Sequence, residues 1–64
     1  MRLTDFWERM GAFFGPAYAD SVARDQVIAE LDGRTVYQAI EQGVDTKDIW
    51  RAVCKRFEVP VSKR

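Results

Sequence analysis

Helix-breaking glycines and prolines divide the chain into short segments, and this punctuation limits what it can fold into. The breaks fall at Gly15-Pro16, Asp32-Gly33, Gly43 and Val59-Pro60. Glycine readily adopts the backbone conformation that ends a helix, and proline cannot continue one. Between the breaks, apolar residues recur at the three- and four-residue spacing of a helix face, whereas no hairpin dipeptide separates alternating apolar runs.

This pattern predicts an all-α fold. We expect a compact single-domain bundle of about four short helices over residues 1–60. Residues 61–64 follow the last proline and are expected to form a disordered tail.

The first two helices are predicted from their ends. Thr4 is the expected N-cap of the first helix, with Asp5 placed where the helix dipole favours an anion. That helix should stop at Gly15, and Pro16 can open the next one. The apolar phase drifts along the second segment. We favour one helix over residues 17–31, with a break near Arg24-Asp25 as the open alternative.

The last two helices carry clearer capping signals. Thr35 and Gln38 fit a capping box, in which each side chain bonds the backbone N–H of the other residue. Gly43 should end the third helix. Asp45 is the natural N-cap of the fourth, with Val44 and Ile49 placed as a hydrophobic staple. Its buried face is expected to comprise Ile49, Trp50, Val53 and Phe57.

The source of stability follows from length and composition. The chain has 64 residues, one cysteine and no histidine, so it lacks an internal disulfide and the usual four-ligand zinc site. A chain this short buries only about 60% of its unfolded surface. Aromatic packing or association must therefore hold it together. We expect no metal, no cofactor and no membrane span, and a cytoplasmic protein with Cys54 reduced.

Catalytic constellations are sparse in this sequence. General acid–base chemistry most often uses histidine, which is absent. Asp20 with Asp25, or Asp45 with Asp48, could form carboxylate pairs, but caps and solvated charges are the better interpretation. Cys54 has cationic neighbours but no histidine base, so a structural thiol is favoured. We expect a protein without enzymatic activity and without catalytic residues.

Residues 35–54 match the spacing of a helix-turn-helix, with a small residue, a turn glycine and flanking apolar positions at Ala39, Gly43, Val44 and Ile49. A DNA-binding protein would use residues 46–56. The side chains expected at the DNA are Thr46, Lys47, Trp50, Arg51, Lys55 and Arg56. The competing interpretation is a tight corner between two helices without a role in DNA binding. Such a corner needs the same small residue, capping residue and hydrophobic staple.

The charge pattern favours a structural helix corner over a DNA-binding helix-turn-helix. Ten Lys plus Arg balance ten Asp plus Glu, whereas specific DNA binders usually carry a basic surface. Asp45 and Asp48 would repel phosphate at the start of the reading helix, and Trp50 fits the core. The charge is uneven, however. Residues 1–46 hold four Arg against eight acids, and residues 47–64 hold six Lys plus Arg against two acids.

A domain this small cannot be expected to hide all its aromatic rings. Trp7, Tyr18 and Tyr37 are candidates for contact with a partner, because Trp and Tyr dominate binding hot spots; core packing is the competing interpretation. The favoured function is a small interaction module that binds an unidentified protein partner or self-associates. The alternative is a helix-turn-helix protein that binds DNA.

The chain contains the segments MRLTDFWERM, FGPAYADSVARD, LDGRT and GVDTKDIWRAVCKRFEVP. In these segments it resembles a family of small actinobacterial proteins known only as a domain of unknown function. The resemblance implies a short cytoplasmic helical protein and supplies no activity or cofactor. Arg2, Arg34 and Arg51 are polar members of these segments. The candidate partner-binding residues are therefore Arg2, Tyr18, Arg34 and Tyr37.

Overall fold

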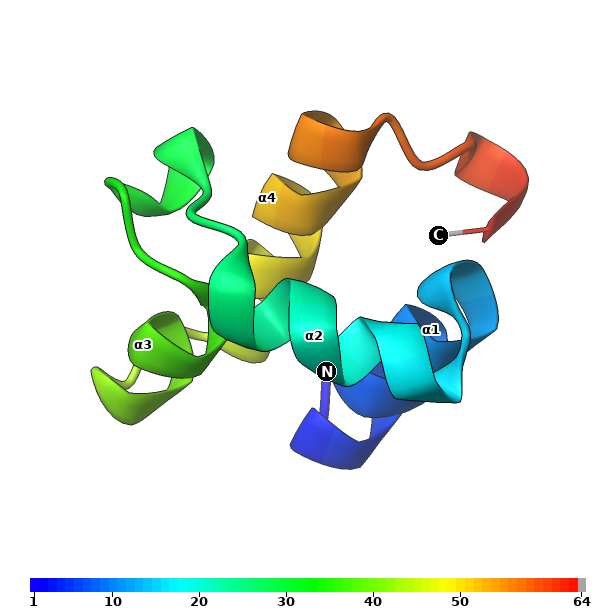
Figure 1. The fold of residues 1–64 in the computed structure, drawn as a ribbon, viewed down its shortest axis with the longest axis horizontal. Helices are drawn as coiled ribbons and strands as arrows, with labels where there is room; N and C mark the ends of the chain where they lie inside the picture. The colour runs from blue at the N-terminus through cyan, green and yellow to red at the C-terminus, as the bar shows by residue number, and fades with distance from the viewer. Residues whose placement is uncertain (64) are drawn as a thin grey trace.

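The computed structural model describes residues 1–63, and these residues form four α-helices joined by short turns (Figure 1). The helices are α1 (Leu3–Phe14), α2 (Pro16–Asp25), α3 (Val36–Glu41) and α4 (Thr46–Phe57). Two 3₁₀ turns, η1 (Ala29–Leu31) and η2 (Val61–Lys63), complete the described part of the chain. The predicted all-α bundle is confirmed.

The α1–α2 corner is built around Gly15, as expected. Gly15 has φ 90°, a backbone conformation that side-chain-bearing residues rarely adopt. Its N–H donates to the Gly11 carbonyl at 2.8 Å, and its own carbonyl accepts from the Ala19 N–H at 2.8 Å. One residue thus closes α1 and opens α2, with Pro16 in the first helical position.

The predicted start of α1 is wrong by two residues. Arg2, not Thr4, is the N-cap residue, and helical structure begins at Leu3. The Asp5 carboxylate accepts the Arg2 backbone N–H at 3.4 Å, so the acid predicted to complement the dipole also reaches back over the helix start.

The favoured continuous helix over residues 17–31 is also wrong, and the alternative break near Asp25 is correct. After Asp25 the chain becomes extended, and the Ile28 N–H donates to the Arg34 carbonyl at 3.0 Å. Ile28 is fully buried, whereas Val27 is 57% exposed. Successive residues of an extended segment point to opposite sides, so Ile28 reaches the core without burying its neighbour.

The α3–α4 corner forms as its capping signals predict. The Thr35 Oγ1 accepts the Gln38 N–H at 3.2 Å, while the Gln38 Oε1 accepts the Thr35 N–H at 2.9 Å. Gly43 has φ 80° in the turn, and the Asp45 carboxylate caps α4 by accepting the Lys47 N–H at 3.1 Å. The helix-turn-helix-like corner is therefore present in the fold.

The core lies where α2 and α4 both pack against α1 and α3. Phe6 and Trp50 meet edge to face at its centre, with ring centroids 6.1 Å apart. Of the predicted buried face of α4, Ile49, Trp50 and Val53 are buried and Phe57 is half-buried. Tyr18 is the aromatic residue that stays exposed, at 60% of its surface.

The chain beyond α4 is partly ordered by the core. Glu58 adopts a left-handed conformation, and the Val59 N–H then donates to the Cys54 carbonyl at 3.0 Å. Val59 is buried, whereas Val61 in η2 is 82% exposed. The expected tail at 61–64 stays a prediction, and residue 64 lies outside the described residues.

Candidate binding surfaces

The first candidate site is a hollow of about 460 Å³ between α1 and α4, here called the basic hollow. Arg9 contributes from α1, and the other lining residues come from successive turns of α4: Lys47, Trp50, Arg51, Cys54 and Lys55. The spacing explains the arrangement, because residues three and four apart share one side of a helix.

The basic hollow is electrostatically one-sided. Its lining residues include four cationic side chains and no carboxylate. Arg51 makes an ion pair with Asp48 outside the hollow, but the two charged atoms are 3.9 Å apart and both side chains are largely exposed. Such surface pairs contribute little, so Arg51 stays available to a ligand. The site is suited to binding anions.

Two buried side chains complete the lining of the hollow. Cys54 and Trp50 are 3% and 4% exposed, and the Trp50 Nε1 atom has no hydrogen-bond partner among the described residues. A buried donor without an acceptor costs about 1–3 kcal/mol. The hollow therefore combines cationic groups with an apolar base and one unsatisfied indole N–H.

The residues predicted to contact DNA are only partly brought together. Lys47, Arg51 and Lys55 line the hollow together with Trp50, and the burial of Trp50 confirms its predicted place in the core. The Thr46 hydroxyl donates to the Met1 carbonyl at 2.6 Å and thus serves the fold. Arg56 lies over the Phe57 ring at 5.7 Å, outside the hollow.

The sequence interpretation missed Arg9. Arg9 lies outside the apolar spacing of α1, so that spacing gives no signal for it. Phe6 and Met10 anchor that face in the core, and Arg9 precedes Met10 at the edge of the buried stripe. Only the packing of α1 against α4 could place it beside Lys47 and Lys55.

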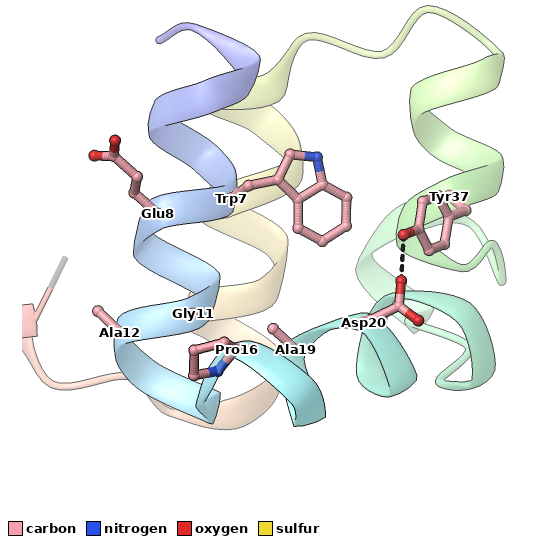
Figure 2. A pocket seen from close by; sticks show the side chains of 8 residues that line it. All are labelled: Trp7, Glu8, Gly11, Ala12, Pro16, Ala19, Asp20 and Tyr37. Atoms are coloured by element: carbon pink, nitrogen blue, oxygen red, sulfur yellow. Dashed lines mark hydrogen bonds between the residues drawn. The ribbon is translucent and has the colours of Figure 1, made fainter.

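The second candidate site is a groove of about 590 Å³ among α1, α2 and α3, here called the aromatic groove. Figure 2 shows Trp7 pointing from α1 toward Tyr37 on α3, with Asp20 of α2 beneath the phenol. The complete lining is Trp7, Glu8, Gly11, Ala12, Pro16, Ala19, Asp20 and Tyr37.

Tyr37 is held in place by polar contacts on one side and a ring on the other. Its hydroxyl donates to the Asp20 carboxylate at 2.5 Å, and Asp20 pairs with Arg24 at 3.0 Å. The Tyr37 and Trp7 ring centroids lie 5.4 Å apart. The hydrogen bond to Asp20, with partial burial and the nearby carboxylate, raises the pKa of Tyr37 above 10.0.

The candidate partner-binding residues do not converge. Tyr37 lines the aromatic groove, but Arg2, Tyr18 and Arg34 line neither surface. The Arg34 guanidinium donates to the Leu31 carbonyl at 3.4 Å and contacts Asp32 at 3.5 Å, so it stabilises the turn after η1. Arg2 lies at the start of α1, and exposed Tyr18 touches the Phe14 ring.

Three of the four acids considered as carboxylate pairs have structural contacts. Asp45 caps α4, Asp48 pairs with Arg51, and Asp20 bonds Tyr37 and Arg24. Within residues 1–63, no three metal-ligating side chains are grouped to hold an ion. In the same part of the chain, no helix has the length and apolar character to cross a membrane.

These observations describe a small helical domain with a helix-turn-helix-like corner and the two candidate binding surfaces described above. The chain belongs to the family described as "Protein of unknown function (DUF3046)", which it matches over residues 1–62. No curated protein and no solved structure matches it.

Proposed function

We propose that the protein is a non-enzymatic, cytoplasmic interaction module that binds an acidic segment of a partner protein in the basic hollow. The observation that carries this proposal is the convergence of four cationic side chains from two helices, without a carboxylate in the lining. Charge complementarity of this kind steers association and selects partners.

The geometry favours a peptide segment over a small anion. Lys47, Arg51 and Lys55 follow one another along α4 at intervals of one helical turn, so they can match several carboxylates of one chain. Arg51 can also grip a carboxylate through two hydrogen bonds. The buried Trp50 and Cys54 offer an apolar base, which suits a segment with one apolar residue among its acids.

DNA binding is the second candidate, and one observation favours it. Lys47, Arg51 and Lys55 lie on the helix that follows the helix-turn-helix-like corner. Against it, Trp50 is buried and the Thr46 hydroxyl is bonded within the fold. The chain also has equal numbers of cationic and acidic residues, and DNA binders usually show a basic excess.

Neighbouring residues on α4 allow a matched test of the two candidates. Lys55 lines the hollow and Arg56 does not, although both are exposed cations. The protein and its Lys55→Ala, Arg51→Ala and Arg56→Ala variants are titrated with a peptide of glutamates containing one leucine, and separately with random duplex DNA. Chemical shifts and fluorescence report binding.

If the hollow binds the acidic segment, Lys55→Ala and Arg51→Ala each weaken the peptide about two- to fivefold, and Arg56→Ala leaves it unchanged. The Trp50 indole signal should move on binding. If DNA is the ligand, all three variants weaken it, and each lowers the salt slope by about 1. Absence of peptide binding at low salt would contradict the proposal.

Self-association is tested in the same samples. Sedimentation over a range of protein concentrations measures the oligomeric state without any ligand. A monomer that binds the acidic peptide fits the proposal, whereas an oligomer that loses its contacts on Lys55→Ala would make a second copy the occupant of the hollow.

A further inference from the structure

We propose that the aromatic groove is a separate docking site, for a proline-rich segment of a partner protein that carries a basic residue. The groove lies among α1, α2 and α3, whereas the basic hollow lies between α1 and α4. The inference therefore does not depend on what the hollow binds.

The wall of the groove is aromatic and only half-buried. Trp7 and Tyr37 both retain accessible ring surface, with centroids 5.4 Å apart and planes tilted by 39°. Grooves lined by such rings bind the polyproline helix, whose rings pack on aromatic faces and whose backbone is already extended before binding. Little conformational entropy is then lost on association.

The floor of the groove is made of residues without long side chains: Gly11, Ala12, Pro16 and Ala19. Figure 2 shows Pro16 and Ala19 of α2 below the Trp7 ring, with Gly11 on α1 and Ala12 on the other side of α1. A floor of this kind lets the backbone of an extended segment approach closely. None of these four residues has a flexible side chain that would have to be displaced or ordered.

The charge of the groove selects the basic residue of the ligand. Its lining includes the carboxylates of Glu8 and Asp20 and no Lys or Arg. Asp20 is occupied by Tyr37 and Arg24, but Glu8 is exposed and forms no ion pair with any residue that the structure describes. An arginine at one end of the segment could pair with Glu8, which Figure 2 shows on the side of α1 away from the Trp7 ring.

The groove is also pre-organised. The hydrogen bond between the Tyr37 hydroxyl and Asp20 joins α3 to α2 and fixes one wall. Arg24 lies over the Tyr37 ring, with its Cζ atom 5.9 Å from the centroid. Because Tyr37 is held in this way, its ring need not be ordered when a ligand arrives.

The test uses the intact protein, labelled with ¹⁵N, and three synthetic peptides. The first alternates prolines and leucines and has one arginine at an end. In the second, alanines replace the prolines, and in the third glutamate replaces the arginine. Trp7→Ala and Glu8→Lys alter the groove. Tyr18→Ala and Glu41→Lys are matched controls, since both residues are exposed and line neither surface.

The first peptide should shift the Trp7 indole signal, and the other two should bind more weakly. Trp7→Ala should reduce affinity at least about tenfold, as expected of an aromatic hot spot. Glu8→Lys should reduce it about two- to fivefold, and the two control variants should bind normally. If circular dichroism shows that Trp7→Ala does not fold, the comparison of peptide affinity between Glu8→Lys and its control Glu41→Lys still tests the inference.

Several results would overturn the inference. They are no shift with the first peptide, equal binding of the alanine peptide, or unchanged affinity in the foldable groove variants. Shifts of groove residues that grow with protein concentration alone would show a second copy in the groove instead. Lys55→Ala should leave binding of this peptide unchanged, which separates failure here from failure of the basic hollow.

Discussion

The Tyr37 hydroxyl donates to the Asp20 carboxylate at 2.5 Å, across 17 positions of sequence. This contact ties α3, a helix of only six residues, to α2. A helix so short has little stability of its own. Its position therefore depends on tertiary contacts such as this one and the Trp7–Tyr37 ring contact.

Replacing Tyr37 by Phe should destabilise the fold by about 1 kcal/mol, because the ring remains and only the hydrogen bond is lost. Urea unfolding measures the difference. Tyr18→Phe is the matched control. Tyr18 is 60% exposed, so the control should leave stability within about 0.5 kcal/mol of the parent protein. Equal effects of both substitutions would show that the Asp20 contact contributes nothing.

The same tyrosine should make stability fall at alkaline pH. Its pKa in the fold is raised above 10.0 by the hydrogen bond to Asp20, followed by burial. Below the unfolded pKa the tyrosine is protonated in both states, and its contribution is complete. Above it, the unfolded chain loses the proton first, so the contribution is lost as pH rises through the folded pKa.

The measurement is the free energy of unfolding at about pH 8 and about pH 11, which bracket the ordinary tyrosine pKa. Tyr37→Phe should show a smaller alkaline loss than the parent protein. Other groups titrate in both proteins alike, so the difference isolates Tyr37. Parallel pH profiles would rule out a raised pKa.

Two glycines of the α1–α2 corner should respond oppositely to alanine. Gly15 has φ 90°, so Gly15→Ala should cost about 1–3 kcal/mol through backbone strain. Gly11 is helical, and a Cβ there would lie 3.9 Å from the Pro16 Cα, an ordinary contact. Gly11→Ala should therefore stabilise the protein by up to about 1 kcal/mol. Thermal and urea unfolding measure both, and matching signs would contradict this account.

The capping box formed by Thr35 and Gln38 should contribute much of the stability of α3. Thr35→Ala removes the acceptor for the Gln38 N–H and should cost about 1 kcal/mol. Amide hydrogen exchange in α3 should rise more than in α4. Thr4→Ala is the control, because Thr4 is an exposed residue within α1 and not its N-cap; a comparable loss there would count against the assigned helix start.

The parts of the fold that could be predicted from the sequence are those fixed by local bonds. Thr35, Gly43 and Asp45 each act on residues within a few positions, so their roles follow from spacing. The end of α2 could not be predicted in the same way. It depends on the pairing of Ile28 with Arg34, which forms only when the turn between them closes.

The candidate surfaces, too, could be predicted only where residues of one helix are close in sequence. Lys47, Arg51 and Lys55 share one side of a single helix and were predictable as a cationic stripe. Arg9 joins them only through the packing of α1 on α4. Tyr37 was selected as an aromatic residue, but its contacts with Trp7 and Asp20 link three helices and leave no signal in sequence spacing.

Glu8 and Arg9 are consecutive residues, yet Glu8 lines the aromatic groove and Arg9 lines the basic hollow. Consecutive positions on a helix are about 100° apart around its axis. The helix α1 thus separates the acidic aromatic groove from the basic hollow. A rotation of α1 about its own axis would move both side chains in the same direction, so such a rotation would change both surfaces together.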